Sequence, residues 1–488
     1  MNKIFLFTLI TFCLSVTFIS CKKDKFITDT NAKVSFSQDS VLFDTVFTTI
    51  GSTTRQIRVR NMNKQKINIS SVRLQNGNSS MFTLNVDGTA GKSVSDVEIL
   101  AQDSIYIFIQ VNVNPTLPVT SSPFVIQDKI LFNVNGNEQS VALEAWGQDA
   151  YYHFPNKAIQ YKTGFLPYST VSTGTNVTVN WINDKPHVIY GWLVVDSTQK
   201  LTIAAGVKVY LHQNAGLWVY RYGTLQINGT KGNEVTFQGD RRELDYADVP
   251  GQWDRIWINE GHTDNYINYA IIKNGYIGVQ AEVLLNISQP KRLRITNTII
   301  KNCSKWGIYG VAFNLWGSNN VVVNCKEYCA ALTLGGNYTF LYTTFANYFN
   351  KDGGRGIQPS VHIDNNSGGQ YFPLDSAYFG NCIIDGSISN ELELDINSSS
   401  TFTKNYKFNS CLLKTTVFSG TASVNNVFNQ SANFINASSY DFKIGNSSAA
   451  RNIGDPALTT IYPYIFVQTD ILGAVRSGSI DAGAYQYP

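Results

Sequence analysis

The most constraining feature of this sequence is a pair of apolar residues that returns at a nearly regular interval in the second half of the chain. The pairs stand in the segments NYAIIKNG, NTIIKNC, NVVVNC, YTTFAN, NCIIDG and SCLLK, and successive pairs are 28, 22, 23, 39 and 29 residues apart. An interval in the low twenties with loop insertions is typical of a coil made of three short strands and three turns. The sequence therefore predicts stacked coils, in which the recurring asparagines hydrogen-bond their counterparts one coil away.

From Trp192 onward, short strand-like segments alternate with turns centred on Gly or Asn, and no helical pattern separates them. Parallel strands without crossover helices require a chain that coils on itself. This pattern predicts a parallel β-helix as the main body.

The region from Trp192 to Lys414 resembles the right-handed parallel β-helix, or pectate-lyase-like, superfamily as found in outer-membrane lipoproteins. GVKVYLHQNAGLWVYRYGTLQINGT resembles the opening coil of that superfamily, and PGQWDRIWI resembles its recurrent Trp-containing rung. DFKIGNSSAARNIGD and DILGAVRSGSIDAGAYQYP resemble a closing segment of related surface proteins. The resemblance implies an architecture and no single activity, because this fold hosts lyases, hydrolases, esterases, binders and stalks.

The N-terminus has the pattern of a lipoprotein signal peptide. A basic MNK precedes an apolar run over residues 4–19, and the FISC that ends at Cys21 resembles a lipobox. In this pattern the chain is cut before Cys21, whose thiol then carries a diacylglycerol with fatty acids such as palmitate. Lys22 after the cysteine favours the outer membrane. The alternative is an ordinary secretory signal with a chance cysteine.

Residues 33–148 contain seven segments of alternating polar and apolar residues with turns between them: VSFSQDSVLFDTVF, RQIRVRN, INISSVRL, MFTLNVDG, DSIYIFIQVNV, DKILFNVNG and SVALEAW. Seven such strands predict an immunoglobulin-like β-sandwich. FDTVFTTIGSTTRQIRVRN resembles the opening of immunoglobulin-like modules in bacterial surface proteins.

The expected fold class is therefore all-β, with an N-terminal immunoglobulin-like β-sandwich followed by a right-handed parallel β-helix. The expected divisions are a signal peptide (1–20), a lipidated tether (21–32), the sandwich (33–148), the β-helix (149–440) and a closing segment (441–488). A net charge of only +3 argues against nucleic acid as a partner. The expected partners are a membrane, through the lipid anchor, and a polysaccharide.

Five cysteines remain once Cys13 is removed with the signal and Cys21 carries lipid. An odd number cannot be fully paired, and four of the five stand in similar apolar contexts, so we expect buried free thiols in equivalent repeat positions. The sequence contains no CxxC, no Cys/His metal spacing and no calcium loop. We therefore expect neither a metal nor a cofactor.

Two charged patches are candidate catalytic sites. The first combines Asp254, Arg255, His262 and Lys273, which we expect to share one face if the coils stack. A lyase needs a base and a cation for the substrate carboxylate, and a hydrolase needs two carboxylates. The alternative is that Asp254 and Arg255 form an ion pair at a rung edge.

The second patch combines Asp352, Arg355 and His362. It falls in the 39-residue interval, so we expect an insertion that emerges from the coils, and loops often carry function. The alternative is an ordinary turn at the Asp-Gly-Gly stretch.

Aromatic residues make up 13% of the chain, and exposed rings stack well on sugar faces. The candidate glycan-stacking residues are Trp253, Trp257, Trp306 and Trp316, although about half of the aromatics must face the core, because side chains at alternating positions of a strand point inward. These observations predict a surface-exposed, lipid-anchored β-helix protein that binds or presents to a glycan. The alternatives are a polysaccharide lyase or glycoside hydrolase, and a structural spacer or adhesin.

Overall fold

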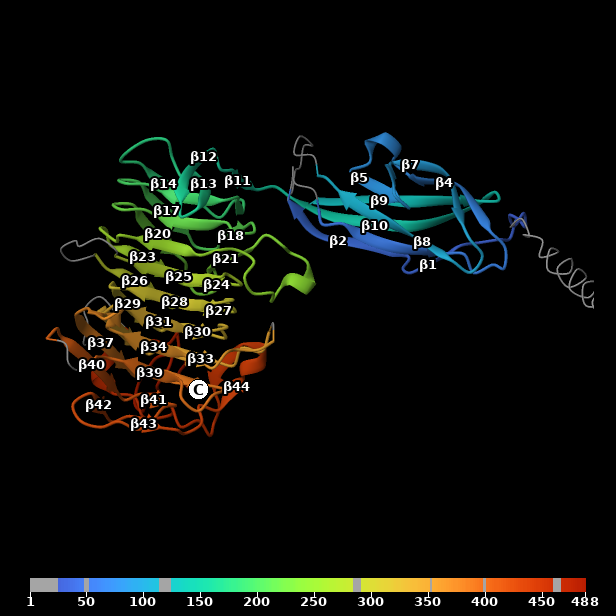
Figure 1. The fold of residues 1–488 in the computed structure, drawn as a ribbon. Helices are drawn as coiled ribbons and strands as arrows, with labels where there is room; N and C mark the ends of the chain where they lie inside the picture. The colour runs from blue at the N-terminus through green and yellow to red at the C-terminus, as the bar shows by residue number, and fades with distance from the viewer. Residues whose placement is uncertain are drawn as a thin grey trace, which may run out of the picture. The chain divides into compact units, whose positions relative to one another are not determined.

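The computed structural model describes residues 25–47, 52–113, 124–283, 291–351, 353–397, 401–459 and 467–488 (Figure 1). The chain is nearly all β and divides into two compact units, Met1–Asp149 and Ala150–Pro488, each with its own hydrophobic core. The predicted signal peptide and Cys21 lie outside the described residues.

The first unit is a β-sandwich of two five-stranded sheets with the strand orders β1-β3-β8-β5-β6 and β2-β10-β9-β4-β7. All neighbours are antiparallel except β10 and β2, which pair in parallel. The strands are β1 (Ser35–Phe36), β2 (Ser40–Phe47), β3 (Arg55–Arg60), β4 (Ile67–Leu74), β5 (Phe82–Val86), β6 (Thr89–Gly91), β7 (Ser93–Ile99), β8 (Ser104–Val111), β9 (Phe124–Val134) and β10 (Asn137–Gln148), with a 3-10 turn η1 (Gly77–Ser79). Alternate residues of the strands face inward, as in SIYIFIQV of β8, and this alternation forms the core. The immunoglobulin-like class of the sandwich stays a prediction.

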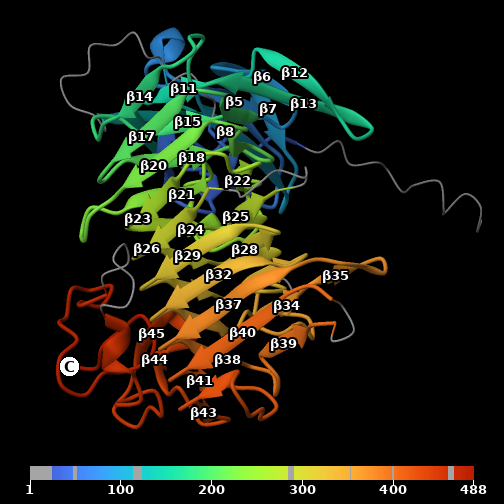
Figure 2. The same cartoon turned by 90° about the vertical axis from the view of Figure 1, so that its left-hand side faces the viewer.

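The second unit is a parallel β-helix, whose chain runs through three sheets in turn and stacks one coil on the next (Figures 1 and 2). Sheet 1 contains β11 (Tyr151–His153), β15 (His187–Ile189), β18 (Lys208–Leu211), β21 (Val235–Gly239), β24 (Ala270–Lys273), β27 (Ile299–Lys301), β30 (Val321–Val323), β33 (Thr344–Asn347), β38 (Ile383–Gly386), β41 (Leu412–Leu413) and β43 (Val427–Phe428). Sheet 2 contains β12 (Lys157–Tyr161), β13 (Gly164–Thr170), β16 (Trp192–Val195), β19 (Gly216–Val219), β22 (Ile256–Asn259), β25 (Ile277–Glu282), β28 (Trp306–Val311), β31 (Ala330–Thr333), β34 (Val361–Asp364) and β39 (Leu392–Asp395). Sheet 3 contains β14 (Thr178–Trp181), β17 (Lys200–Ala204), β20 (Thr224–Asn228), β23 (Asn265–Asn268), β26 (Leu293–Thr296), β29 (Asn314–Ser318), β32 (Gly336–Leu341), β37 (Leu374–Gly380), β40 (Lys404–Asn409) and β42 (Ser423–Val424). The predicted fold class, all-β with a parallel β-helix, is confirmed.

The apolar pairs found in the sequence all lie in sheet 1, in one register. The first members of the pairs align from coil to coil, in the order Ile271, Ile299, Val321, Thr344, Ile383 and Leu412. The second member of each pair points into the core of the coil and is fully buried, from Ile272 to Leu413. The 39-residue interval therefore contains one coil with an insertion, because β33 and β38 are direct neighbours.

The asparagines and cysteines beside these pairs also stack as predicted. Asn302 donates from Nδ2 to Oδ1 of Asn274 at 2.8 Å, one coil away. Both asparagines adopt a positive φ, which Asn tolerates better than most residues and which turns the chain out of sheet 1. The five described cysteines are free and buried: Cys303, Cys325, Cys329, Cys382 and Cys411. Burial raises the pKa of the Cys325, Cys329 and Cys382 thiols, so these side chains act as small apolar groups.

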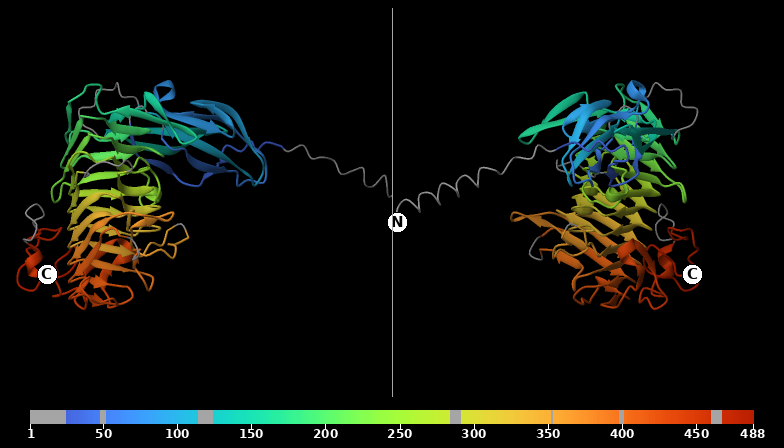
Figure 3. Two further views of the ribbon diagram at one scale, coloured as in Figure 1. Left: turned by 60° about the vertical axis from the view of Figure 1, so that its left-hand side comes forward. Right: turned by 90° about the vertical axis from the view of Figure 1, so that its right-hand side faces the viewer.

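The C-terminal segment covers part of the outer face of sheet 1 and runs beside the lower coils (Figure 3). It contains the antiparallel pair β44 (Phe434–Asn436) and β45 (Asp441–Ile444), and the turns η3 (Ala437–Ser439) and η4 (Pro456–Thr459). Phe442 and Ile471 pack there against Val321 and Val323. Two further short elements are η2 (Leu244–Tyr246) and the hairpin β35 (Asn366–Ser367) and β36 (Gln370–Tyr371).

Two stacked histidines lie in the first coils of the β-helix. His153 on β11 and His187 on β15 share a hydrogen bond of 3.0 Å between Nε2 and Nδ1, and the His187 ring stacks on Trp181 with centroids 3.7 Å apart. Burial lowers the pKa of His153 to about 4. Burial and then the charge of His153 lower the pKa of His187 to about 3. Both imidazoles are therefore neutral near pH 7.

We predict that this pair makes the second unit sensitive to acid. Both folded pKa values lie below 6.5, so as the pH falls the unfolded chain binds protons before the folded chain does. The contribution of the pair to the free energy of unfolding is therefore fully present above pH 6.5 and is lost as the pH falls toward 4. His153 alone should account for about 3 kcal/mol of that loss. Urea unfolding at several pH values should show a shallower loss in His153→Gln. His362→Gln is the control, because the pKa of His362 is raised, so this group changes stability only above pH 6.5 and its removal should leave the slope between pH 6.5 and 4 unchanged. An unchanged slope in His153→Gln would contradict the account.

Candidate functional site

The outer face of sheet 2 carries a column of aromatic and polar side chains. Residues at one register position point inward and form the core, among them Leu217, Ile256 and Val279. The next position along each strand points outward, because side chains alternate across a strand. In coil order this outward column reads Trp218, Trp257, Gln280, Tyr309, Ala331, His362 and Glu393.

The upper part of this column forms a pocket of about 640 Å³, called here the sheet 2 pocket. Such a volume lies within the usual range for small-molecule sites. The lining residues are Tyr161, Lys162, Leu166, Trp192, Trp218, Asp254, Arg255, Trp257, Asn259, Glu260, Gln280 and Glu282. Six come from the neighbouring strands β16, β19, β22 and β25, three flank β22, and three come from the hairpin of β12 and β13.

Three tryptophans form the apolar wall of the pocket. Trp218 and Trp257 stack with centroids 4.9 Å apart and planes at 14°, and Trp192 meets Trp257 edge on at 5.8 Å. Gly216 makes room for this arrangement, because a Cβ at that position would lie 2.6 Å from the Trp192 ring. Tyr161 from the hairpin meets Trp257 edge on at 6.2 Å.

Two buried carboxylates lie beside the tryptophans. Glu282 accepts hydrogen bonds from Trp257 Nε1 at 2.8 Å, Asn259 Nδ2 at 3.0 Å and Gln280 Nε2 at 2.6 Å. Glu260 is only 6% exposed, and its Oε2 has no hydrogen-bond partner among the described residues. The two residues lie side by side at the ends of the neighbouring strands β22 and β25, where the Glu260 amide donates to the Glu282 carbonyl at 2.8 Å.

Glu260 also adopts a strained backbone conformation, with φ of +68°. A non-glycine residue in this region costs about 1 kcal/mol or more and persists where the surroundings hold it in place. Ala312 and Leu334 adopt the same conformation directly after β28 and β31, so this φ belongs to the turn that follows the sheet 2 strands. The observation that points to function is the buried carboxylate oxygen without a partner among the described residues.

A second cluster lies three coils further along the same face, about 14 Å from Gln280 by strand spacing. His362 is held there between two carboxylates, with Nδ1 at 2.7 Å from Glu393 Oε2 and Nε2 at 3.0 Å from Asp364 Oδ2. Burial lowers the pKa of His362, but the hydrogen bonds and charges of Asp364 and Glu393 outweigh it, so the net pKa is raised. Tyr328 packs against the imidazole at 5.3 Å.

The structure separates the members of the first predicted patch. Asp254 and Arg255 form an ion pair in the sheet 2 pocket, where Arg255 Nη1 also donates to Gln280. Lys273 ends β24 on sheet 1, and its Nζ donates to the Ala247 carbonyl at 3.4 Å. The prediction that these residues share one face is wrong for Lys273, because β24 and β22 belong to different sheets.

His262 also lies away from that pocket, in the turn between β22 and β23. Its ring packs on Tyr222 with centroids 4.4 Å apart, and its Nε2 accepts a hydrogen bond from Arg221 Nε at 3.3 Å. His262 is therefore held by neighbours of the preceding coil.

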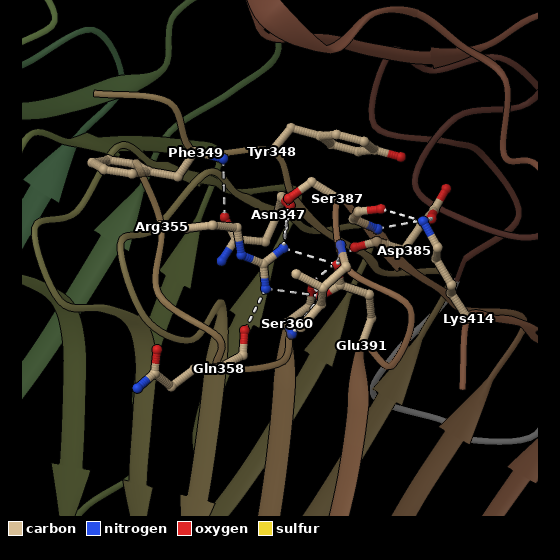
Figure 4. A network of polar contacts seen from close by, with 12 residues as sticks. Asn347, Tyr348, Phe349, Arg355, Gln358, Ser360, Asp385, Ser387, Glu391 and Lys414 are labelled. Atoms are coloured by element: carbon tan, nitrogen blue, oxygen red, sulfur yellow. Dashed lines mark hydrogen bonds and ion pairs between the residues drawn. The ribbon is translucent and has the colours of Figure 1, made fainter. Parts of the chain in front are cut away.

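The second predicted patch contains a buried structural clamp (Figure 4). Arg355 pairs with Glu391 through Nη1–Oε1 at 2.8 Å and Nη2–Oε2 at 2.9 Å, and the two side chains are 5% and 0% exposed. Arg355 also donates to the carbonyls of Asn347 and Gln358, and Ser360 Oγ donates to Glu391 at 2.8 Å. These contacts bind the insertion to the coils, so Arg355 has no access to a substrate. Asp352 lies outside the described residues.

The four tryptophan candidates occupy different environments. Trp257 lines the sheet 2 pocket. Trp253 is 1% exposed in the core and donates to the Lys273 carbonyl. The prediction that it stacks on a glycan is therefore wrong. Trp306 lies on sheet 2, packs against Tyr309 and donates to Glu327 at 2.7 Å. Trp316 lies on sheet 3 beneath the guanidinium of Arg292.

Glu260 and Glu282 are absent from the sequence-based candidates. The sequence signal for them is the similarity of two segments, WINE at 257–260 and QAE at 280–282. In the structure these segments pair so that Asn259 lies opposite Glu282. Reading that alignment requires the register between two coils, which the apolar pairs of sheet 1 define only for sheet 1.

Among the described residues, no group of three or more His, Cys, Asp and Glu side chains is arranged to hold a metal ion. Over the same ranges, no helix has the length and apolar character needed to cross a membrane.

Comparisons with known proteins give distant structural likenesses only. No protein-family model matches the chain, and no curated protein matches its sequence. The catalytic unit of a GH87 alpha-1,3-glucanase from Streptomyces thermodiastaticus is 10% identical over 76% of this chain and 75% of that chain, with a TM-score of 0.31. A GH87 alpha-1,3-glucanase catalytic domain in complex with nigerose is 13% identical over 76% of this chain and 86% of that chain, with a TM-score of 0.20. A family 123 glycoside hydrolase from Clostridium perfringens is 8% identical over 31% of this chain and 30% of that chain, with a TM-score of 0.18. The β-helix assignment rests on the strand order and register instead.

We predict that Arg355→Met destabilises the second unit by about 3–5 kcal/mol, because it leaves the Glu391 carboxylate buried without its cation. Urea unfolding measures the loss. Lys443→Met is the matched control, since the Lys443–Asp441 pair is 51% and 31% exposed and should contribute less than about 1 kcal/mol. Equal effects of the two substitutions would contradict a structural role for the clamp.

Proposed function

We propose that this chain is a lipid-anchored surface protein that binds a glycan in the sheet 2 pocket. The observation that carries the proposal is a pair of unsatisfied polar atoms in a tryptophan-lined pocket. Trp218 Nε1 is a buried donor and Glu260 Oε2 is a buried acceptor, and neither has a partner among the described residues. Each such group costs about 1–3 kcal/mol if it stays unpaired. Both residues line the pocket, and sugar hydroxyls both donate and accept, so they can pair with polar groups of either kind there.

The aromatic wall supports the same ligand class. A sugar ring has apolar faces and polar edges, and indole rings combine a large apolar surface with one donor. Trp257 is partly exposed, and its Nε1 is fixed by Glu282, so its ring orientation is set before a ligand arrives. A preorganised wall reduces the entropy that binding costs.

A second candidate function is glycoside hydrolysis, favoured by the two carboxylates of neighbouring coils. Glycosidases use two carboxyl groups with different environments, one as acid and one as base or nucleophile. Glu282 is saturated with donors, whereas Glu260 is unpaired. A lyase is less favoured, because Arg255, one of the two cations that line the pocket, is engaged by Asp254 and Gln280. Shortening of an oligosaccharide by the wild type but not by Glu260→Gln would support hydrolysis.

We predict that Trp257→Ala weakens glycan binding about tenfold or more, because it removes the centre of the aromatic wall. Calorimetry with a panel of neutral, acidic and amino oligosaccharides checks this. Tyr371→Ala is the matched control, since Tyr371 is 37% exposed on β36 outside the pocket and its loss should leave affinity unchanged. Binding that Trp257→Ala leaves intact would contradict the proposal, and a chain that binds no glycan would favour the spacer or adhesin alternative.

The lipid anchor rests on the lipobox that ends at Cys21. We predict that the chain incorporates labelled palmitate in a Gram-negative host and fractionates with the outer membrane. Cys21→Ser should abolish incorporation, because it removes the thiol that carries the lipid. Cys13→Ser should not, because that cysteine lies within the cleaved signal. Unchanged labelling of Cys21→Ser would contradict the anchor.

A further inference from the structure

The ionisable side chains of the sheet 2 pocket are unbalanced. Its lining contains the carboxylates of Asp254, Glu260 and Glu282 and the cations of Lys162 and Arg255, which leaves one excess negative charge. The distribution of these charges is more informative than their sum, because two of them neutralise each other.

Arg255 and Asp254 form that neutral pair. Arg255 Nε bonds Asp254 Oδ1, and its Nη1 donates to Gln280 Oε1, so the guanidinium has no hydrogen bond to either glutamate. Lys162 is exposed in the turn of the hairpin, with its Nζ 5.4 Å from the centroid of the Tyr161 ring. Neither Glu260 nor Glu282 has a cationic nitrogen within 4.0 Å among the described residues.

The two glutamates satisfy their oxygens in different ways. Glu282 receives three neutral donors, which solvate its charge without cancelling it. Glu260 is only 6% exposed, and its Oε2 accepts no hydrogen bond from the described residues. Burying a carboxylate without a partner is costly, and a cation placed beside it offsets that cost.

We infer that the glycan bound in the sheet 2 pocket carries a free amino group, which lies beside Glu260, and no acidic group. An ammonium supplies both the positive charge and the donor that Glu260 lacks. The indole rings of the wall also attract cations through their faces. A uronate or a sulfated sugar would bring a negative charge against Glu260 and Glu282, and like charges in a partly buried site repel.

This inference rests on the proposed glycan-binding function, and the test separates the two. Calorimetry compares three oligosaccharide probes of equal length: a glucosamine oligomer, its N-acetylated counterpart and a galacturonic acid oligomer. We expect the glucosamine oligomer to bind about tenfold more tightly than the acetylated one, and the acidic oligomer to bind most weakly. Glu260→Gln should remove the preference for the free amine, so that the glucosamine oligomer and the acetylated oligomer bind with about equal affinity.

Glu234→Gln is the matched control, because Glu234 accepts from the Gly232 amide outside the pocket and should leave the preference intact. Equal or tighter binding of the acetylated or acidic oligomer, with binding still lost in Trp257→Ala, overturns the amino-sugar inference and leaves the glycan site standing. A preference that survives Glu260→Gln overturns the role of Glu260. Absence of binding to all three probes and to neutral oligosaccharides overturns both the inference and the proposed function.

Discussion

The hydrogen bonding of each coil to the next, in one fixed register, is the constraint on which the second unit depends. It places the apolar pairs of sheet 1 in a single column, from Ile271 to Leu412. Because the side-chain period of a strand is two, this register also decides which residues face outward. A shift of one residue in sheet 2 would turn Trp257 into the core and Ile256 to the surface.

The fold could be predicted from the sequence because its signal repeats. The apolar pairs recur at the same position of successive coils, with asparagines and cysteines beside them. An insertion in one coil therefore does not hide the pattern. The candidate site could be predicted only in part. Asp254 and Arg255 do lie in the pocket, but Lys273 falls on another sheet, because a separation of about twenty residues does not reveal which sheet a strand joins. Trp253 and Trp257 look alike in sequence, but the structure buries Trp253 in the core and leaves Trp257 partly exposed on sheet 2.

Burial of charge separates structural from functional residues here. Glu391 and Glu260 are both buried carboxylates, but Glu391 has a bidentate arginine and further donors, whereas Glu260 has an oxygen without a partner among the described residues. A network in which every polar atom is hydrogen-bonded rigidifies the fold. A buried polar atom without a hydrogen-bond partner in a pocket indicates a place for a ligand. No sequence pattern distinguishes the two glutamates, since the difference lies in partners that are distant along the chain.

The central claim is that the outer face of sheet 2 holds the binding site. Hydrogen exchange of the full chain, with and without a saturating concentration of the tightest-binding oligosaccharide, tests it most directly. The account predicts slower exchange confined to β19, β22 and β25 and to the hairpin of β12 and β13. Slower exchange confined to sheet 1 or sheet 3, or to the first unit, would contradict it.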